Sequence, residues 1–212
     1  MNTEHIAFLS KEKIQSIQET RLQELLAYLD KYSPFYKKLF SEKRINITEI
    51  RSLSDLTKLP TTNKEDLQKY NDEFLCVPKD AVTEYTSTSG TLGNPVVIAL
   101  TENDMSRLTY NEYQSFVTAG ATSKDIFQLM LTLDRQFMAG IAYHSGLRKL
   151  GAGIIRIGPG VPSLQWETIM KLQPTAIVAV PSFILKLIDY AKNTGIDINT
   201  TSVKRAICIG EN

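Results

Sequence analysis

The chain has 212 residues, of which 42% are hydrophobic and 22% are charged. A chain of this size buries a core and is near the usual upper size of one domain, so we expect one domain, incomplete overall. Its 24 basic and 23 acidic residues give a net charge of +1, which provides no broad basic surface for nucleic acid or for an acidic membrane.

The N-terminus and the cysteines indicate a cytoplasmic protein. Residues 1–10 lack a basic stretch followed by a long apolar core, and no segment approaches about eighteen consecutive apolar residues. Cys76 and Cys208 are too few for a disulfide framework, and with His5 and His144 they supply few metal ligands. We therefore expect two reduced thiols in apolar runs and no metal bound by side chains.

The first 80 residues are predicted to form an N-terminal helical segment packed on the core. From 11 to 32 the apolar residues recur at helical spacing, with Ser10 as the N-cap. Ser33-Pro34 ends this helix and starts a shorter one that is rich in aromatic residues. Asn63, followed by an acidic stretch, predicts a further short helix to about residue 70.

Residues 81–212 are predicted to form an α/β core. From about residue 125 strands and helices alternate, which predicts a largely parallel sheet with helices on both faces. Ligands bind in such folds where loops leave the carboxyl ends of the strands. The expected strands are 81–85, 96–100, 125–133, 153–157, 176–180 and 203–209; the expected helices are one capped by Thr101 and ending before Gly120, then 137–150, 163–170 capped by Ser163, and 183–193.

Two glycines stand inside the predicted helix 137–150. Gly140 and Gly146 each cost about 1 kcal/mol relative to Ala in a helix. Such a cost indicates close packing or the approach of a ligand, and a helix–helix contact is the favoured explanation.

The stretch 86–95 reads TSTSGTLGNP and is typical of a loop between two strands. Its glycines allow backbone N–H groups to face outward into a concave nest, and its hydroxyl side chains add donors. Such a loop suits the oxygens of a polyphosphate. The composition alone also fits an ordinary polar hairpin turn.

The order of residues 88–95, TSGTLGNP, resembles the phosphate loop of the adenylate-forming superfamily, whose pattern is Ser/Thr-Ser-Gly-Thr-Thr-Gly-Lys-Pro. Six of the eight positions agree. Leu92 and Asn94 replace the second Thr and the Lys, which removes one hydroxyl and one cation that would meet phosphate.

Further segments resemble the phenylacetate-CoA ligase family within that superfamily. They are SPFY at 33–36, LPTTNKEDL at 59–67, FLCVP at 74–78, the spaced residues Phe137, Gly140, His144, Gly146, Leu150 and Gly151, and PSF at 181–183. The resemblance covers about residues 33–212 and implies the N-terminal part of the ligase large domain.

The resemblance implies an ATP-dependent acid:CoA ligase that activates a carboxylate, expected to be an aryl acid, as an acyl adenylate and transfers it to coenzyme A. ATP, Mg²⁺ and coenzyme A are thereby implied, together with a small carboxylic acid; a homodimer is left open. The carboxylate itself attacks the α-phosphate, so no catalytic side chain is assigned. By position in the family, Thr88, Ser89, Gly90, Thr91 and Gly93 would hold phosphate oxygens.

Two further sites follow from the same resemblance. Gly210 and Glu211 match an element that lines the acyl and nucleotide clefts, although Ile209 replaces its first glycine; a solvated Glu211 is the alternative. Phe137 occupies a position near the acyl group, and plain core packing is its alternative.

The family's later elements, including the adenine segment, the ribose-binding aspartate and the C-terminal domain with its catalytic lysine, have no counterpart in these residues. We therefore expect an N-terminal portion that does not form acyl adenylate alone. Two alternatives stay open: a related adenylyl transferase acting on another carboxylate or coenzyme, and a non-catalytic nucleotide-binding or assembly module.

Overall fold

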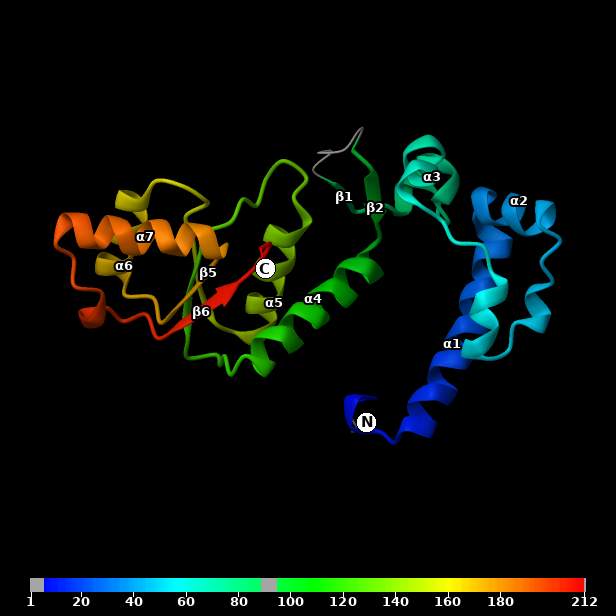
Figure 1. Cartoon of the computed structure of the whole chain (residues 1–212), viewed down its shortest axis with the longest axis horizontal. Helices are drawn as coiled ribbons and strands as arrows, with labels where there is room; N and C mark the ends of the chain where they lie inside the picture. Colours follow the sequence, from blue (N-terminus) through cyan, green and yellow to red (C-terminus); the bar gives the residue numbers. More distant parts are fainter. Residues whose placement is uncertain (1–5, 89–94, 212) are drawn as a thin grey trace. The chain divides into compact units, whose positions relative to one another are not determined.

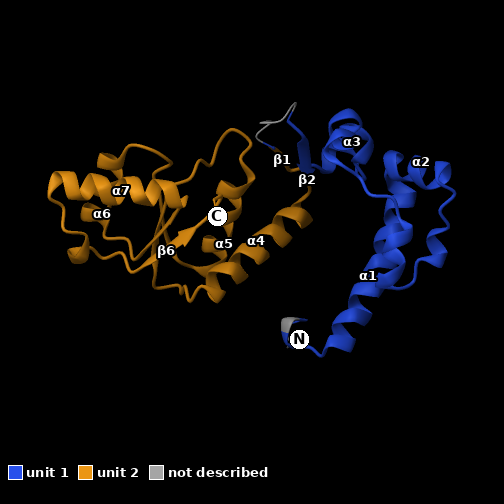
Figure 2. Ribbon diagram, viewed as in Figure 1, with its two compact units in different colours: residues 1–82, 88–99 blue, residues 83–87, 100–212 orange. Residues whose placement is uncertain are grey.

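A computed structural model of the chain (Figure 1) describes residues 6–88 and 95–211. The chain divides into two compact units (Figure 2), one formed by Met1–Val82 and Thr88–Ala99 and the other by Thr83–Ser87 and Leu100–Asn212. Within the described residues, no helix combines the length and the apolar character that crossing a membrane requires. The short strands β1 (Glu84–Ser87) and β2 (Val97–Leu100) form a two-stranded sheet.

The first unit is built mainly from helices, as its apolar periodicity predicts. α1 covers Lys11–Tyr32, and the Ser10 side chain accepts a hydrogen bond from Lys13 N at its start. Ser33 is buried between two helices: its Oγ accepts from Tyr36 N at 3.3 Å and donates to Glu73 O at 3.1 Å. The remaining helices are α2 Pro34–Glu42 and α3 Lys64–Lys69, with the 3₁₀ turns Ile6–Phe8, Ile47–Glu49, Leu53–Lys58, Asn71–Phe74 and Lys79–Ala81.

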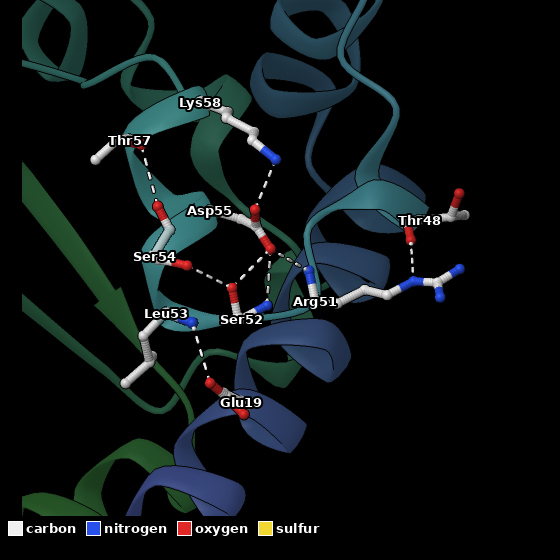
Figure 3. Close-up of polar contacts among 9 residues, drawn as sticks. All are labelled: Glu19, Thr48, Arg51, Ser52, Leu53, Ser54, Asp55, Thr57 and Lys58. Atoms are coloured by element: carbon white, nitrogen blue, oxygen red, sulfur yellow. Dashed lines mark hydrogen bonds and ion pairs between the residues drawn. The ribbon is translucent and has the colours of Figure 1, made fainter.

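The carboxylate of Asp55 forms several hydrogen bonds at the start of the 3₁₀ turn Leu53–Lys58 (Figure 3). The Asp55 carboxylate accepts hydrogen bonds from the backbone N–H groups of Arg51 and Ser52 and from the Ser52 hydroxyl, at 2.8–3.0 Å, and pairs with Lys58 at 2.6 Å. The pairing with Lys58 and these hydrogen bonds hold the pKa of Asp55 well below its usual range. The same turn contacts α1, because Leu53 N donates to Glu19 Oε1 at 3.4 Å.

The second unit contains a four-stranded parallel sheet in the order β4-β3-β5-β6. This confirms the predicted α/β class with a largely parallel sheet. The strands are β3 Ile126–Leu129, β4 Gly153–Arg156, β5 Ala176–Ala179 and β6 Arg205–Cys208; the helices are α4 Glu102–Thr118, α5 Met138–Leu150, α6 Pro162–Leu172 and α7 Pro181–Thr194, with a 3₁₀ turn at Ile198–Thr200.

Helices cover both faces of this sheet because successive side chains of a strand point to opposite faces. On β3, Phe127 and Leu129 pack with Phe116 of α4 and Leu147 of α5 in one buried cluster. On the other face, Met130 packs with residues of α6 and α7. The two clusters also share β5, whose four residues are all buried.

The two helical glycines mark places where α5 approaches other backbone closely. A Cβ added at Gly146 would lie 2.6 Å from the Cβ of Glu112 in α4. A Cβ added at Gly140 would lie 1.9 Å from the carbonyl oxygen of Thr132. The helix–helix explanation is therefore confirmed for Gly146, whereas Gly140 accommodates the loop after β3.

Some predictions of boundaries and burial are wrong. The first strand begins at Glu84 and not at 81, because Lys79–Ala81 forms a 3₁₀ turn. Ser163 does not cap α6, since Pro162 already occupies its first turn, where a missing N–H costs nothing. Cys208 is exposed and not a core thiol, whereas Cys76 is partly buried, and this burial raises the pKa of its thiol.

Candidate functional site

Thr88 and Val96 close the base of the loop that resembles a phosphate loop. Thr88 N donates to Val96 O at 3.0 Å, and Val96 N donates to Thr88 Oγ1 at 3.0 Å. The Thr88 hydroxyl therefore accepts one hydrogen bond from the backbone and keeps its own proton available for donation. Four further predicted phosphate-binding residues lie outside the described residues: Ser89, Gly90, Thr91 and Gly93.

The segment before Thr88 is bound to the loop after β3. Ser87 N donates to Gln136 O at 3.0 Å. Arg135 and Gln136 both have φ of 58°, so two consecutive residues adopt a left-handed conformation that is uncommon for side chains of this size. The turn brings Phe137 directly to the N-terminus of α5.

Phe137 lies at the N-cap position of α5 and is 41% exposed. Its N–H donates to Asp134 O at 3.1 Å, which ties the start of the helix to the loop after β3. Phe137 is therefore not among the buried core residues of the described chain, and it lies in the segment that follows the carboxyl end of β3. Within the same loop, the hydroxyl of Thr132 donates to the Asp134 carboxylate and lowers the pKa of Asp134.

Glu211 is exposed, and its carboxylate is hydrogen-bonded to Ser182. Its carboxylate accepts from Ser182 N at 2.8 Å and from Ser182 Oγ at 2.6 Å. Ser182 is the second residue of α7, so the carboxylate meets the free N–H groups and the positive end of that helix. The hydrogen bond from the Ser182 side chain, followed by that from its backbone, lowers the pKa of Glu211. Glu211 is thus anionic at neutral pH.

Gly210 turns the chain from β6 toward Glu211. Its φ is 75°, a left-handed conformation that glycine adopts without strain. A Cβ at this position would lie 3.4 Å from Cγ1 of Val180. The turn follows a ladder that continues beyond β6, since Ile209 N donates to Ala179 O at 3.2 Å.

Comparisons with known proteins show what the chain is similar to. No protein-family profile matches the chain. A phenylacetate-coenzyme A ligase from Thermus thermophilus is 29% identical over 200 residues, which cover 94% of this chain and 45% of that protein. One from Escherichia coli is 32% identical over 181 residues, which cover 85% of this chain and 41% of that protein.

A solved structure with the same fold is 2-hydroxyisobutyryl-CoA ligase in complex with 2-HIB-AMP and CoA in its thioesterification state. It aligns with a TM-score of 0.87 over 96% of this chain and 44% of that chain, at 20% identity. The chain is thus similar in sequence to phenylacetate-coenzyme A ligases and shares the fold of 2-hydroxyisobutyryl-CoA ligase. It spans less than half the length of the curated relatives it matches.

The superfamily's predicted site residues fall into two groups in this structure. Phe137, Gly210 and Glu211 belong to the unit with the parallel sheet and follow the carboxyl ends of β3 and β6. Thr88 belongs to the other unit. Their roles toward a ligand stay predictions.

Ser182 contacts a predicted site residue, Glu211, although the sequence pattern alone assigns it no role. The PSF segment at 181–183 indicated a resemblance to the phenylacetate-CoA ligase family, and Pro181 marked a helix start. The sequence pattern does not indicate which residue Ser182 contacts, because Ser182 and Glu211 are 29 residues apart. Only the pairing of β5 with β6 brings the two together.

Among residues 6–88 and 95–211, no three His, Cys, Asp or Glu side chains gather as metal ligands. Two open cavities of about 410 and 640 Å³ lie along α4, and neither is lined by Phe137, Gly210 or Glu211. We locate the candidate site by its residue chemistry, because ligands of parallel α/β sheets bind at the carboxyl edge.

Proposed function

We propose that this chain is the N-terminal portion of an ATP-dependent acid:CoA ligase. The complete enzyme would join a carboxylic acid, expected to be aryl, to AMP and then transfer the acyl group to coenzyme A. The observation that carries the proposal is similarity to proteins named phenylacetate-coenzyme A ligase along 85–96% of this chain. The TSGTLGNP loop and the observed α/β fold support it.

In the first step, a carboxylate oxygen would attack the α-phosphorus of ATP, and the bond between the α-phosphorus and its bridging oxygen would break to release pyrophosphate. Thr88, Ser89, Gly90, Thr91 and Gly93 would hold phosphate oxygens through backbone N–H groups and hydroxyls. The proposal for Thr88 is supported by its free hydroxyl proton, since its oxygen already accepts from Val96 N.

In the second step, the coenzyme A sulfur would attack the acyl carbon and AMP would leave. The thiol proton would pass to solvent. Phe137 is proposed to contact the aryl part of the acid, which its 41% exposure permits. Gly210 and Glu211 are proposed to line the cleft, and the bonds from Ser182 would hold the Glu211 carboxylate in a fixed position.

Mg²⁺ would neutralise charge on the phosphates of ATP. The described residues form no group of three metal-ligating side chains, so we propose that phosphate and water oxygens supply most of its ligands, as is usual for Mg²⁺. No residue of this chain is assigned to the metal.

Acid-dependent pyrophosphate release tests the function. The protein encoded by the complete reading frame should release pyrophosphate with ATP and at least one acid of an aryl panel, and should form the acyl thioester with coenzyme A. Residues 1–212 alone should not. Absence of acid-dependent pyrophosphate release by the complete protein would instead favour a non-catalytic module. Robust turnover by residues 1–212 would contradict the proposal that this portion does not form the acyl adenylate alone.

Gly90→Ala and Gly93→Ala test the loop in the complete protein. Each change adds a Cβ where backbone is proposed to approach phosphate. We expect a large loss of activity with an unchanged circular dichroism spectrum. An unchanged dependence on ATP in both variants would make the loop an ordinary turn.

A homodimer and a cytoplasmic location also stay predictions, which light scattering and cell fractionation test.

A further inference from the structure

A pair of buried glutamines connects the middle of the parallel sheet to a loop at its carboxyl edge. Gln128 lies on β3 and Gln165 on α6, and both are at most 1% exposed. Gln128 Nε2 donates to Gln165 Oε1 at 2.7 Å and to Gln165 O at 3.2 Å. Buried amides in an otherwise apolar layer are costly unless they are bonded, so this pair requires an explanation.

The second glutamine binds the backbone of the loop that follows β4. Gln165 Nε2 donates to Gly158 O at 2.9 Å and to Gly160 O at 3.2 Å. Gln128 Nε2 also donates to Gln165 O, a carbonyl that can only accept, so the nitrogen of the Gln128 amide faces Gln165 and requires its Oε1 as the second acceptor. A reversed Gln165 amide would lose this bond and would place its oxygen against the carbonyl oxygens of Gly158 and Gly160. Gln128 thus orients Gln165, and Gln165 holds the loop.

The loop has a conformation that needs such support. Gly158 and Gly160 have φ of 76° and 88°, and Val161 has φ of 33°, which is strained for a β-branched residue. A Cβ added at either glycine would meet nothing within 4 Å. The loop therefore presents its backbone to open space at both glycines, and the two hydrogen bonds from Gln165 bind it on the side of the sheet.

The position of the loop connects it with the proposed chemistry. β4 pairs with β3, with Arg156 opposite Leu129, so the chain leaves both strands at the same edge of the sheet. The loop after β3 leads to Phe137, the residue proposed to contact the acid. The loop after β4 therefore emerges beside the segment that leads to Phe137.

We propose that Gln165, oriented by Gln128, is a positioning residue that holds the Gly158–Gly160 loop as one wall of the site for the carboxylic acid. This inference rests on the proposed ligase function. It predicts a specific defect, in which the KM for the acid rises while the KM for ATP is retained. A purely structural pair would change stability and leave both constants as they are.

The experiment compares Gln165→Met and the double variant Gln128→Met/Gln165→Met with Gln18→Met, an exposed glutamine of α1 that undergoes the same chemical change. In the complete protein, we expect both site variants to raise the acid KM about tenfold, the effect of losing two neutral hydrogen bonds. The double variant should recover thermal stability relative to Gln165→Met, because it leaves no buried amide unpaired, but should not recover the acid KM.

Nuclear magnetic resonance of residues 1–212 supplies a readout that does not depend on activity. Order parameters of the Gly158, Gly160 and Val161 amides should fall from about 0.85 to below about 0.6 in both site variants and stay high in Gln18→Met. Unchanged order parameters would overturn the holding role, and a disordered loop with an unchanged acid KM would overturn the link to the acid. If wild type shows no acid-dependent activity, the ligase function and the acid wall both fail, while the order parameters still decide whether Gln165 holds the loop.

Discussion

Gly146→Ala tests whether the contact between α4 and α5 depends on the absence of a side chain. These helices lie side by side on one face of the parallel sheet (Figure 1). An added Cβ would lie 2.6 Å from Glu112 Cβ, 2.9 Å from Glu112 C and 3.0 Å from Tyr113 N. Carbon atoms pack best at about 3.5–4.0 Å, so the helices would have to separate by about 1 Å at this point.

The expected loss of stability in Gly146→Ala is the difference between two opposing free-energy contributions. Alanine gains about 1 kcal/mol over glycine in a helix interior. Overpacking costs about 1–3 kcal/mol, and the upper end applies because the atoms in the way belong to the backbone or to a Cβ and cannot rotate aside. The net effect is a destabilisation of about 2 kcal/mol, or a fall of about 4–8 °C in Tm for a protein of this size.

Urea unfolding followed by circular dichroism measures this loss. Ser145→Ala is the matched control, because it places alanine on the preceding residue of the same helix by removing an oxygen atom, which cannot overpack the contact with α4, and its stability should equal or slightly exceed that of wild type. A Gly146→Ala protein as stable as wild type would refute the reasoning, since the helix-propensity gain would then outweigh the contact.

Three more substitutions address the loop after β3, the Glu211 contact and the turn in the helical unit. Gly140→Ala should lower the stability of residues 1–212 in urea and the activity of the complete protein, because its Cβ would lie 1.9 Å from Thr132 O; unchanged values would contradict the close approach. Ser182→Ala should raise the pKa of Glu211 toward its ordinary value, as measured by carboxyl ¹³C titration. Because the pKa of Glu211 is lower in the folded protein than in the unfolded one, its hydrogen bonds stabilise the fold above the unfolded pKa, and this stabilisation is lost as the pH falls through the folded pKa. Asp55→Asn should lower the thermal midpoint at neutral pH, and the difference from wild type should shrink as acid protonates Asp55, whose pKa is also depressed; a difference that is independent of pH would exclude the carboxylate charge as its source.

Local signals in the sequence determined much of the fold. The predicted bounds of α1 match those in the structure, and the caps predicted at Ser10, Asn63 and Thr101 each accept the expected backbone hydrogen bond. These features depend on residues within one helical turn of each other, so the pattern alone contains the necessary information. The alternation of strands and helices likewise predicted the parallel sheet, because a parallel connection needs a crossover.

Errors occurred where two local rules competed. The predicted cap at Ser163 gave too little weight to Pro162, whose fixed φ suits the first turn of α6. Cys208 stands in an apolar run, yet it is exposed, while its neighbour Ile207 packs against the core. An apolar run by itself does not state which face of a strand is covered.

The sequence by itself determined the class of fold, the helix starts at Ser10, Asn63 and Thr101, and the resemblance of the 88–95 loop to a phosphate loop. The tertiary structure alone decided which side chains meet: Gln128 with Gln165, 37 residues apart, and Ser182 with Glu211, 29 residues apart. The physical reason is that these contacts depend on the strand order β4-β3-β5-β6 and on the face that each helix covers. Neither is encoded in the spacing of neighbouring residues, because both arise when separate segments bury their apolar sides together.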